Sequence, residues 1–518
     1  MEKNLISRLS VLVVLIAFAT ACSRKTEYTH VIPADATAIA AFNLQSLADK
    51  AGLNDKANEA TKQKMIDALK SGTNATTFQQ LEKLIKDPSE SGIDLQSPVY
   101  VFTATSLPHT TMVAKVNDQQ KLRAWIGLMS KEQLCQPIAE AEGYSFTTIS
   151  DNSLLAFNPT AMFLINVSGT TPTEEAKKSL TALFQQTATS SLSSNAGFEK
   201  MQQQKGDITF LASMGAIPEA YAKQTGMGLP GNVNPRDVML LGNLNFEKGK
   251  ASLQFNYYSD NKEVEAMIQK SQKALLKLNN NLLNYFPAST LALFNVGVNG
   301  TEFYNLMLEN KEFTDNVSIA QADEVKKLFA AVDGDITAGL LNVSLKENAT
   351  PFLLYADVKS ADALKAVYQN KQVLKLGKGE DLLQLGEHEY VYKSRSMNLF
   401  FGVRGKQLYA TNDELIYKEI GQTPKKSIKS AAYASEMNGK NAFAVINIEA
   451  ILELPVVKMM VGFGGEEYGM YHKLASQMTY LAMGVDNQGK SEINLVLKNQ
   501  EVNALKQIVD FAKQFAGM

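Results

Sequence analysis

Two stretches of the chain alternate apolar with other residues, and a helical pattern follows each of them. In residues 253–257 and 493–497, every second side chain is apolar. A period of two is typical of a β-strand that turns one face toward a core. Gly249 and Gly489 stand shortly before these strands. Short glycine turns in this setting favour hairpins, so antiparallel pairing is expected.

The hydrophobic pattern predicts further elements in both halves of the chain. Strands are expected at residues 36–44, 99–103, 112–116 and 207–212, and again at 290–296, 339–343, 352–358 and 442–448. Helices are expected at 58–69 and 78–86, after Thr171 and Thr411 as N-caps, and from Glu263 and Glu501 onward. Because helices and hairpins are mixed without strict βαβ alternation, we expect an α+β fold with helices covering an antiparallel sheet.

Sequence blocks recur with one long period. The segments from Ala114 and Ala356 both fit A-x-V-x5-L-[KR]-A, and those from Asn261 and Asn499 both fit N-x-E-V-x-A. The Gly-Lys turns, the T-x-x-E segments and the openings "PADATAIAAFNL" and "PASTLALFNV" occur in the same order in both halves. Partners lie about 240 residues apart, and such self-similarity is the mark of a repeated structural unit.

The repeat predicts two tandem copies of one domain. The first copy would cover residues 30–275 and the second residues 284–518, each with an antiparallel sheet covered by helices. Between them, residues 279–284 read "NNNLLN" and are interpreted as a short polar linker or a helix end.

The N-terminus has the pattern of a leader peptide. Lys3 and Arg8 precede a short apolar run at 9–18, which is too short to cross a bilayer, and small residues then lead to Cys22. Residues 1–22 resemble the signal peptide of bacterial lipoproteins, in which the lipobox cysteine is lipidated, although Ala19 stands where that motif usually has leucine. The alternatives are an ordinary secretory signal and an uncleaved anchor.

The residues after Cys22 suggest a cellular location, again by resemblance to bacterial lipoproteins. Ser23 rather than aspartate follows the cysteine, which in lipoprotein sorting favours the outer membrane. The next residues, Arg24 and Lys25, are basic, whereas surface-exposed lipoproteins usually carry an acidic run there. We therefore expect an outer-membrane lipoprotein of the cell envelope, on the periplasmic face rather than the cell surface, with its lipid in the membrane.

Composition narrows the class of protein. The chain has 518 residues, a net charge of −2 and 45% hydrophobic residues, values that are ordinary for a globular protein of more than one domain. No clustered basic face indicates nucleic-acid binding. Once Cys22 carries lipid, Cys135 remains alone, so no intramolecular disulfide is expected. We interpret Cys135 as a small buried residue rather than a nucleophile.

The sequence offers no strong catalytic, metal or cofactor motif. The four histidines are widely separated, and neither C-x-x-C, a G-x-S-x-G elbow nor a Walker lysine loop occurs. We therefore assign no catalytic residue, no metal and no cofactor. Trp125 is spaced with Leu122, Ile126 and Met129 on a helix and is interpreted as a core residue.

Each copy contains one glycine-rich segment. The first, "GMGLPG", holds Gly226, Gly228 and Gly231, which formally fit G-x-G-x-x-G but lack the βαβ context of a dinucleotide site. The second, "GFGGEEYG", holds Gly462, Gly464 and Gly465. Both are interpreted as helix ends or flexible loops, with possible binding loops as the functional alternative.

A resemblance to a known family rests on two segments beside the leader. "YTHVIPADATAIAAFNLQSLADKAGL" and "SGIDLQSPVYVF" are similar to a family of uncharacterised Bacteroidetes lipoproteins, a domain of unknown function, over nearly the whole mature chain. The resemblance implies a location in the cell envelope and a domain architecture. It supplies no activity, cofactor or site residue.

Three functions are compatible with these observations. The first is a non-catalytic binding or scaffolding module, whose partner would be an envelope protein or a glycan and whose two copies would raise avidity. The second is an envelope hydrolase with a site between the copies. The third is a carrier of lipids or other apolar cargo, which requires a long apolar cavity.

Overall fold

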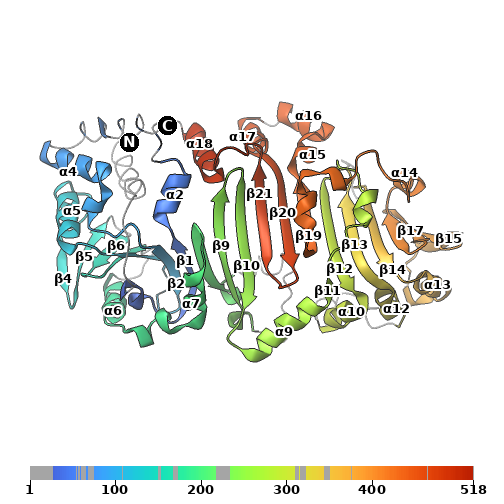
Figure 1. Cartoon of the computed structure of the whole chain (residues 1–518), viewed down its shortest axis with the longest axis horizontal. Helices are drawn as coiled ribbons and strands as arrows, with labels where there is room; N and C mark the ends of the chain where they lie inside the picture. The colour runs from blue at the N-terminus through green and yellow to red at the C-terminus, as the bar shows by residue number, and fades with distance from the viewer. Residues whose placement is uncertain are drawn as a thin grey trace. The chain divides into compact units, whose positions relative to one another are not determined.

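A computed structural model describes residues 27–516 except 54, 56–58, 60–62, 64–65, 68–69, 71–74, 108, 150–152, 167–172, 218–233, 310–313, 315–322, 344–349, 375 and 464. The chain forms two compact units (Figure 1). Unit 1 comprises residues 1–218, 238–251 and 501–518, and unit 2 comprises residues 219–237 and 252–500. Both are α+β, so the predicted fold class is confirmed.

Unit 1 is built on one antiparallel sheet. Its strands, in spatial order, are β9 (Met239–Glu247), β8 (Ile208–Ser213), β1 (Ala36–Phe42), β2 (Val99–Ala104), β3 (Thr111–Lys115), β7 (Ala161–Asn166), β6 (Ser153–Phe157), β5 (Tyr144–Ile149) and β4 (Ala139–Ala141). Its helices are α2 (Leu44–Lys50), α4 (Ala75–Lys86), α5 (Gln119–Lys131), α6 (Thr173–Phe184), α7 (Ala196–Gln203) and α18 (Ala504–Ala516). Helix α5 packs on the sheet through Leu122, Ile126 and Met129, and Trp125 joins this cluster, as its spacing predicted.

Unit 2 is also built on one antiparallel sheet. Its strands, in spatial order, are β10 (Lys250–Tyr258), β21 (Ser491–Leu497), β20 (Met478–Asp486), β19 (Lys440–Asn447), β12 (Ala292–Asn299), β13 (Val332–Leu340), β14 (Phe352–Val358), β18 (Gln407–Thr411), β17 (Asn398–Arg404), β16 (Glu389–Lys393) and β15 (Asp381–Gly386). The two-residue strand β11 (Leu275–Leu276) pairs with the end of β12.

The helices of unit 2 lie between these strands in the chain. They are α9 (Lys262–Lys273), α10 (Gly300–Glu309), α12 (Asp323–Ala331), α13 (Asp362–Gln369), α14 (Glu414–Lys418), α15 (Ile448–Leu452), α16 (Pro455–Phe463) and α17 (Gly465–Ala475). One side of the sheet forms the main core, which includes Leu293, Tyr355, Tyr409, Phe443 and Val445.

The two sheets share one connectivity. From β9 to β4 and from β20 to β15, each strand of unit 1 has a counterpart at the same place in the order of unit 2. Isolated bridges also correspond, because Pro33 pairs with Ser191 in unit 1 and Pro287 pairs with Ser427 in unit 2. These prolines begin the two similar opening segments of the sequence.

The C-terminal helix α18 is part of unit 1. It contacts α2 and β9, and Ala504 in its first turn is fully buried. Just before the helix, the Asn503 side-chain amide donates to the carbonyl oxygen of Phe246 (2.9 Å), and the N–H of Gly249 donates to the carbonyl of Val502 (2.9 Å). The compact units thus differ from the repeat boundaries 30–275 and 284–518, which stay a prediction about the sequence repeat.

Most expected strands agree with the structure, and β13 differs most. Strand β14 has the predicted bounds, whereas β13 covers 332–340 instead of 339–343. The segment Asp333–Asp335 resembles a turn in sequence, but it is a bulged part of the strand in which Gly334 has φ +136°. A carboxylate buried inside a strand has no signature in the local pattern.

That carboxylate fixes the asparagine-rich segment to unit 2. Asp335 is fully buried and accepts the backbone N–H groups of Asn279 (3.1 Å) and Asn280 (2.8 Å). Burial, followed by the neighbouring Asp357 carboxylate, raises the pKa of Asp335. Leu282 and Leu283, which follow in the chain, are buried in the core of unit 2. The segment read as a polar linker is therefore a tightly held part of a core.

The helix caps agree with the sequence in part. Thr411 does not cap α14, because its hydroxyl donates to the carbonyl of Phe352 (2.6 Å) inside the sheet. Asp413 caps the helix instead, accepting from the N–H groups of Leu415 and Ile416. An anionic cap two residues closer to the helix replaces the expected threonine. Thr171, the other expected cap, and most of 58–69 lie outside the described residues.

Candidate functional site

The sheet of unit 2 has a second apolar face, on the side opposite its main core. Leu293, Val445 and Ala482 point into the core, so the residues next to them along each strand point to the other side. We call that side the apolar face. Its members on β12, β13, β14, β19, β20 and β21 are Ala292, Phe294, Ala338, Leu340, Phe352, Leu354, Ala444, Ile446, Leu481, Met483, Ile493 and Leu495.

Strand register makes this face continuous. Phe294 stands opposite Ala444, and Ala444 stands opposite Met483 on the next strand. Met483 in turn pairs with Ile493, and on the other side Phe294 pairs with Ala338. Directly opposite residues in antiparallel strands have Cβ atoms about 4.5–5.5 Å apart, so these side chains are neighbours.

The centre of the apolar face is open. The side chains of Phe294, Ile446 and Met483 are 49%, 44% and 38% exposed. An antiparallel sheet with one solvated face normally carries polar residues there. A group of neighbouring large apolar side chains left in solvent instead marks a site where a protein, a membrane or a ligand binds.

Helices cover the part of the face that lies beyond β13. Val358 on β14 and Leu408 on β18 have the same orientation as Leu354, and they join a cluster with Leu364 of α13 and Leu328 of α12. The open part is therefore bordered on that side by helices. Its exposed large side chains lie on β12, β19 and β20.

The matching face of unit 1 is more fully covered. Phe42 occupies the place of Phe294 in the similar opening segments, and it is half-buried. Its neighbours of the same orientation, Val101 and Phe210, are half-buried as well. The two sheets thus share an apolar second face, and the exposed version occurs in unit 2.

Three helices at one end of the face add further exposed apolar residues. Helices α15, α16 and α17 connect the end of β19 to the start of β20, and α15 contacts β20 (Figure 1). In α16 and α17, large side chains are exposed, namely Met459 (52%), Met460 (48%), Phe463 (86%) and Tyr471 (56%). The connection between β19 and β20 thus carries exposed apolar side chains of its own.

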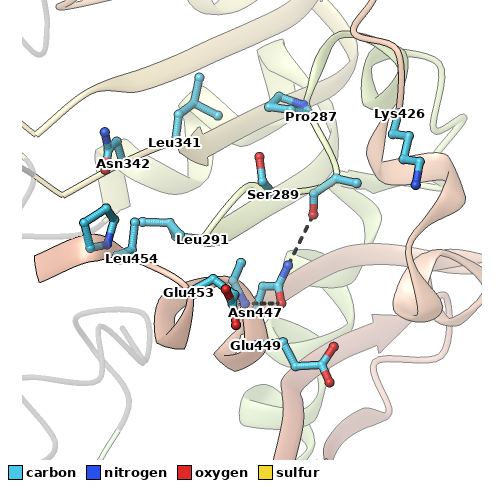
Figure 2. A pocket seen from close by; sticks show the side chains of 13 residues that line it. Pro287, Ser289, Leu291, Leu341, Asn342, Lys426, Asn447, Glu449, Glu453 and Leu454 are labelled. Carbon is cyan, nitrogen blue, oxygen red and sulfur yellow. Dashed lines mark hydrogen bonds between the residues drawn. The ribbon is translucent and has the colours of Figure 1, made fainter. Parts of the chain in front are cut away.

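A pocket of about 760 Å³ opens at the same end of the sheet (Figure 2). Asn447 anchors its wall, because its amide donates to the Ala288 carbonyl (3.3 Å) and its oxygen accepts the N–H of Ala450 (3.1 Å). Leu291 and Leu454 contribute apolar surface. The size suits a small ligand.

The carboxylates of this pocket belong to a solvated rim. Glu453 lies 2.5 Å from Lys458, whose ammonium lowers the pKa of Glu453, and Glu449 lies 3.9 Å from Lys498. Each carboxylate therefore has a lysine partner at the surface. Acid–base catalysis requires instead two titratable groups whose environments drive their pKa values apart.

The residues singled out by sequence are placed as follows. Cys22, Gly226, Gly228, Gly231 and Gly464 lie outside the described residues. Gly462 is in α16, and Gly465 begins α17 with φ +72°, so the second glycine-rich segment forms the break between two helices. The binding role of the two segments stays a prediction.

Cys135 is a buried free thiol. It is 8% exposed and packs with Ile126 and Met129, and burial raises the pKa of its thiol. A raised pKa keeps the group in the unreactive thiol form. Within the described part of the chain, no group of three or more histidine, cysteine, aspartate or glutamate residues is placed to hold a metal ion.

Sequence reasoning missed the apolar face. The signal was present in "LALFNV", "FAVINI" and "TYLAMGV", which are nearly continuous apolar runs. Such runs are typical of strands buried on both faces. Alternation of the kind seen at residues 253–257 and 493–497 predicts only the face of a strand that meets a core.

Comparison with known proteins gives one family match. The model of domain of unknown function DUF4836 matches residues 28–505. No curated protein matches the chain. Crystal forms IV and III of TP0453 align at 12% identity over 45% and 48% of this chain and 81% and 88% of theirs, with TM-scores of 0.24 and 0.25. At these TM-scores the similarity supports no conclusion about fold or function.

Proposed function

We propose that this chain, which belongs to the family of domain of unknown function DUF4836, is a lipid-anchored protein of the cell envelope that acts by binding rather than by catalysis. The observation that carries the binding role is the open centre of the apolar face, formed by Phe294, Ile446 and Met483. Exposed apolar surface of this kind is stabilised when a partner covers it.

The anchor rests on the leader and Cys22. Acyl chains on that cysteine would hold the protein on a membrane, since each buried CH₂ contributes about 0.8 kcal/mol. Among the described residues, no helix has both the length and the hydrophobicity to cross a bilayer. The proposed address is the periplasmic face of the outer membrane, in a bacterium of the Bacteroidetes.

Substitution of Cys22 by alanine should release the protein from the membrane. Cys22→Ala removes the thiol that would carry the lipid, so the chain is expected in the soluble fraction of the envelope. Cell fractionation and the mass of the purified protein measure both effects. A Cys22→Ala protein that stays in the membrane fraction with unchanged processing would refute the anchor.

We also infer that the two units descend from one duplicated domain. The shared strand order, the equivalent bridges at Pro33 and Pro287 and the repeated sequence blocks support this inference. Duplication explains why both sheets carry an apolar second face. It also allows one copy to keep that face covered while the other leaves it open.

A photo-crosslinking side chain at position 294 tests the binding role. We expect this residue, in the full chain in its own envelope, to form a covalent adduct with whatever covers the apolar face. Leu415 is the matched control, because it is 71% exposed but lies on α14, whose neighbouring residues Ile416 and Tyr417 pack against the main core. If position 294 yields no more adduct than position 415, the apolar face is not the binding surface.

A further inference from the structure

We propose that a second, polar pocket of unit 2 binds a sugar acid, that is, a ligand with a carboxylate and several hydroxyl groups. The pocket has a volume of about 710 Å³ and shares no lining residue with the apolar face, so this inference goes beyond the proposed function. It lies among α9, β11, the start of β19 and the turn between β20 and β21. Its lining residues are Gln269, Gln272, Lys273, Leu275, Leu276, Lys277, Gly439, Asn441 and Asn487.

The pocket carries positive charge and no acid. Lys273 and Lys277 line it, and none of the nine lining residues is aspartate or glutamate. Neither ammonium group has an ion pair with a described carboxylate. Glu492 on β21 is paired with Lys440 (3.1 Å), and Asp486 accepts two backbone N–H groups of its own turn (2.9 and 3.0 Å). The two free lysines therefore favour an anionic ligand.

Asn441 adds a hydrogen-bond acceptor at the buried side of the pocket. It is 5% exposed, and its amide donates to the Leu275 carbonyl (3.4 Å), while its buried Oδ1 has no donor among the described residues. Buried polar atoms are nearly always bonded, so an unpaired one points to a partner. A hydroxyl group can donate to this oxygen, whereas an ionised carboxylate cannot. An ammonium group could donate as well, but two lysines would repel it.

Unit 1 has a carboxylate at the position that Asn441 occupies in unit 2. Strands β8 and β19 hold the same place in the two sheet orders. Asp207 stands six residues before Ser213, which caps the 3₁₀ helix η6 (Met214–Ala216), and Asn441 stands six residues before Asn447, which caps α15. Both Asp207 and Asn441 are buried. The two side chains are therefore equivalent.

The contacts of Asp207 show what unit 2 lacks. The Asp207 carboxylate accepts the ammonium of Lys50 (2.7 Å) and the hydroxyl of Ser46 (2.5 Å). Unit 2 has a neutral amide at this position, although two lysines line the pocket beside it. A ligand carboxylate would thus supply in unit 2 the negative charge that Asp207 supplies in unit 1.

The remaining polar side chains favour a sugar acid over a simple carboxylate. Gln269, Gln272 and Asn487 each present an amide, which both donates and accepts hydrogen bonds, as a sugar hydroxyl does. Gln272 of α9 lies against Gly489 in the turn between β20 and β21, where an added Cβ would come within 2.0 Å of its Nε2. Helix and turn thus border the pocket together. Its volume lies in the range of sites for small ligands.

A titration of the full chain carrying Cys22→Ala, followed through the NMR signals of the ligand, tests the proposal. The probes are D-glucuronate and D-galacturonate, their neutral parents D-glucose and D-galactose, and acetate, which has no hydroxyl group. We expect at least one uronate to bind about tenfold more tightly than its parent sugar and than acetate, because charged hydrogen bonds and hydroxyl contacts both contribute.

Two pairs of lysine substitutions locate the charge that matters. Lys273→Gln combined with Lys277→Gln removes both ammonium groups of the pocket and should weaken uronate binding about tenfold. Lys262→Gln combined with Lys270→Gln removes the same charge from α9 outside the pocket lining and should leave binding unchanged. All four lysines are exposed, so both double variants are expected to fold.

Asn441→Asp tests the comparison with unit 1. It introduces at position 441 the carboxylate that unit 1 has as Asp207, so we expect it to pair with the pocket lysines and abolish uronate binding. Its thermal unfolding midpoint, compared with that of the parent chain, separates this effect from a loss of folding.

Three results would overturn the proposal. They are uronates that bind no more tightly than their parent sugars or acetate, an equal loss of binding in the two lysine double variants, and full uronate binding by a folded Asn441→Asp chain. The crosslinking experiment at position 294 is independent of these results, because that residue lies on the apolar face.

Discussion

Replacement of Asp207 by alanine is expected to lower the free energy of unfolding of unit 1 by about 3 kcal/mol. The Asp207 side chain is only 3% exposed and joins three segments of unit 1. It accepts the hydroxyl of Ser46 (2.5 Å), the ammonium of Lys50 (2.7 Å) and the backbone N–H of Phe246 (2.7 Å).

The expected loss comes mainly from groups that alanine would leave buried and unpaired. The backbone N–H of Phe246, in β9, would lose the Asp207 carboxylate as its acceptor. A buried donor left without a partner costs about 1–3 kcal/mol of stability. The hydroxyl of Ser46 would lose its acceptor too. Lys50 is 32% exposed and can turn to water, so the loss of its ion pair adds less than a fully buried pair would.

Trp125 provides the measurement. It is the only tryptophan of the chain and lies in α5 of unit 1, so its fluorescence during denaturant unfolding reports on that unit. Asp55→Ala is the control, because Asp55 is half-exposed and its distance to Lys506 is 3.9 Å. If Asp207→Ala and Asp55→Ala shift the transition equally, the buried contacts of Asp207 do not hold unit 1 together.

The residues that anchor each unit explain which parts of the fold could be predicted. Strand β14 and the hairpin of β20 and β21 follow from local alternation and a glycine turn, and the structure has both. Asp207 and Asp335 act through partners far away in the chain, such as Ser46 and Asn279. Local patterns cannot reveal such contacts, so the buried carboxylates and the bulge of β13 were missed.

The candidate site was missed for a related reason. Alternation identifies the face of a strand that meets a core, and it says nothing of a second face that is also apolar. In β12, Leu293 points into the core while Phe294 is exposed, and both are large apolar residues. Only the register across β12, β19 and β20 shows that Phe294, Ile446 and Met483 form one surface.

Removal of residues 501–518 is expected to destabilise unit 1 by at least about 4 kcal/mol, through the loss of α18 and of the apolar area that it buries. The sequence repeat assigns residues 501–518 to the second copy, so it predicts that their removal would destabilise that copy instead. In the structure α18 contacts α2 and β9 of unit 1, and Ala504 is fully buried there. The experiment therefore decides whether α18 stabilises unit 1, which it contacts, or the second copy, to which the repeat assigns it.

Two readouts distinguish the outcomes of this truncation. Trp125 fluorescence should report an early transition of unit 1, while amide hydrogen exchange in β13 and β14 of unit 2 should keep its protection. Asn503→Ala is the milder variant, because it removes the bond to the Phe246 carbonyl and the cap on the N–H of Leu505 (2.9 Å), a loss of about 1–2 kcal/mol. A chain that ends at Ala516 serves as the control. If the truncated chain lost protection in β13 while Trp125 kept its transition, α18 would stabilise the unit to which the repeat assigns it.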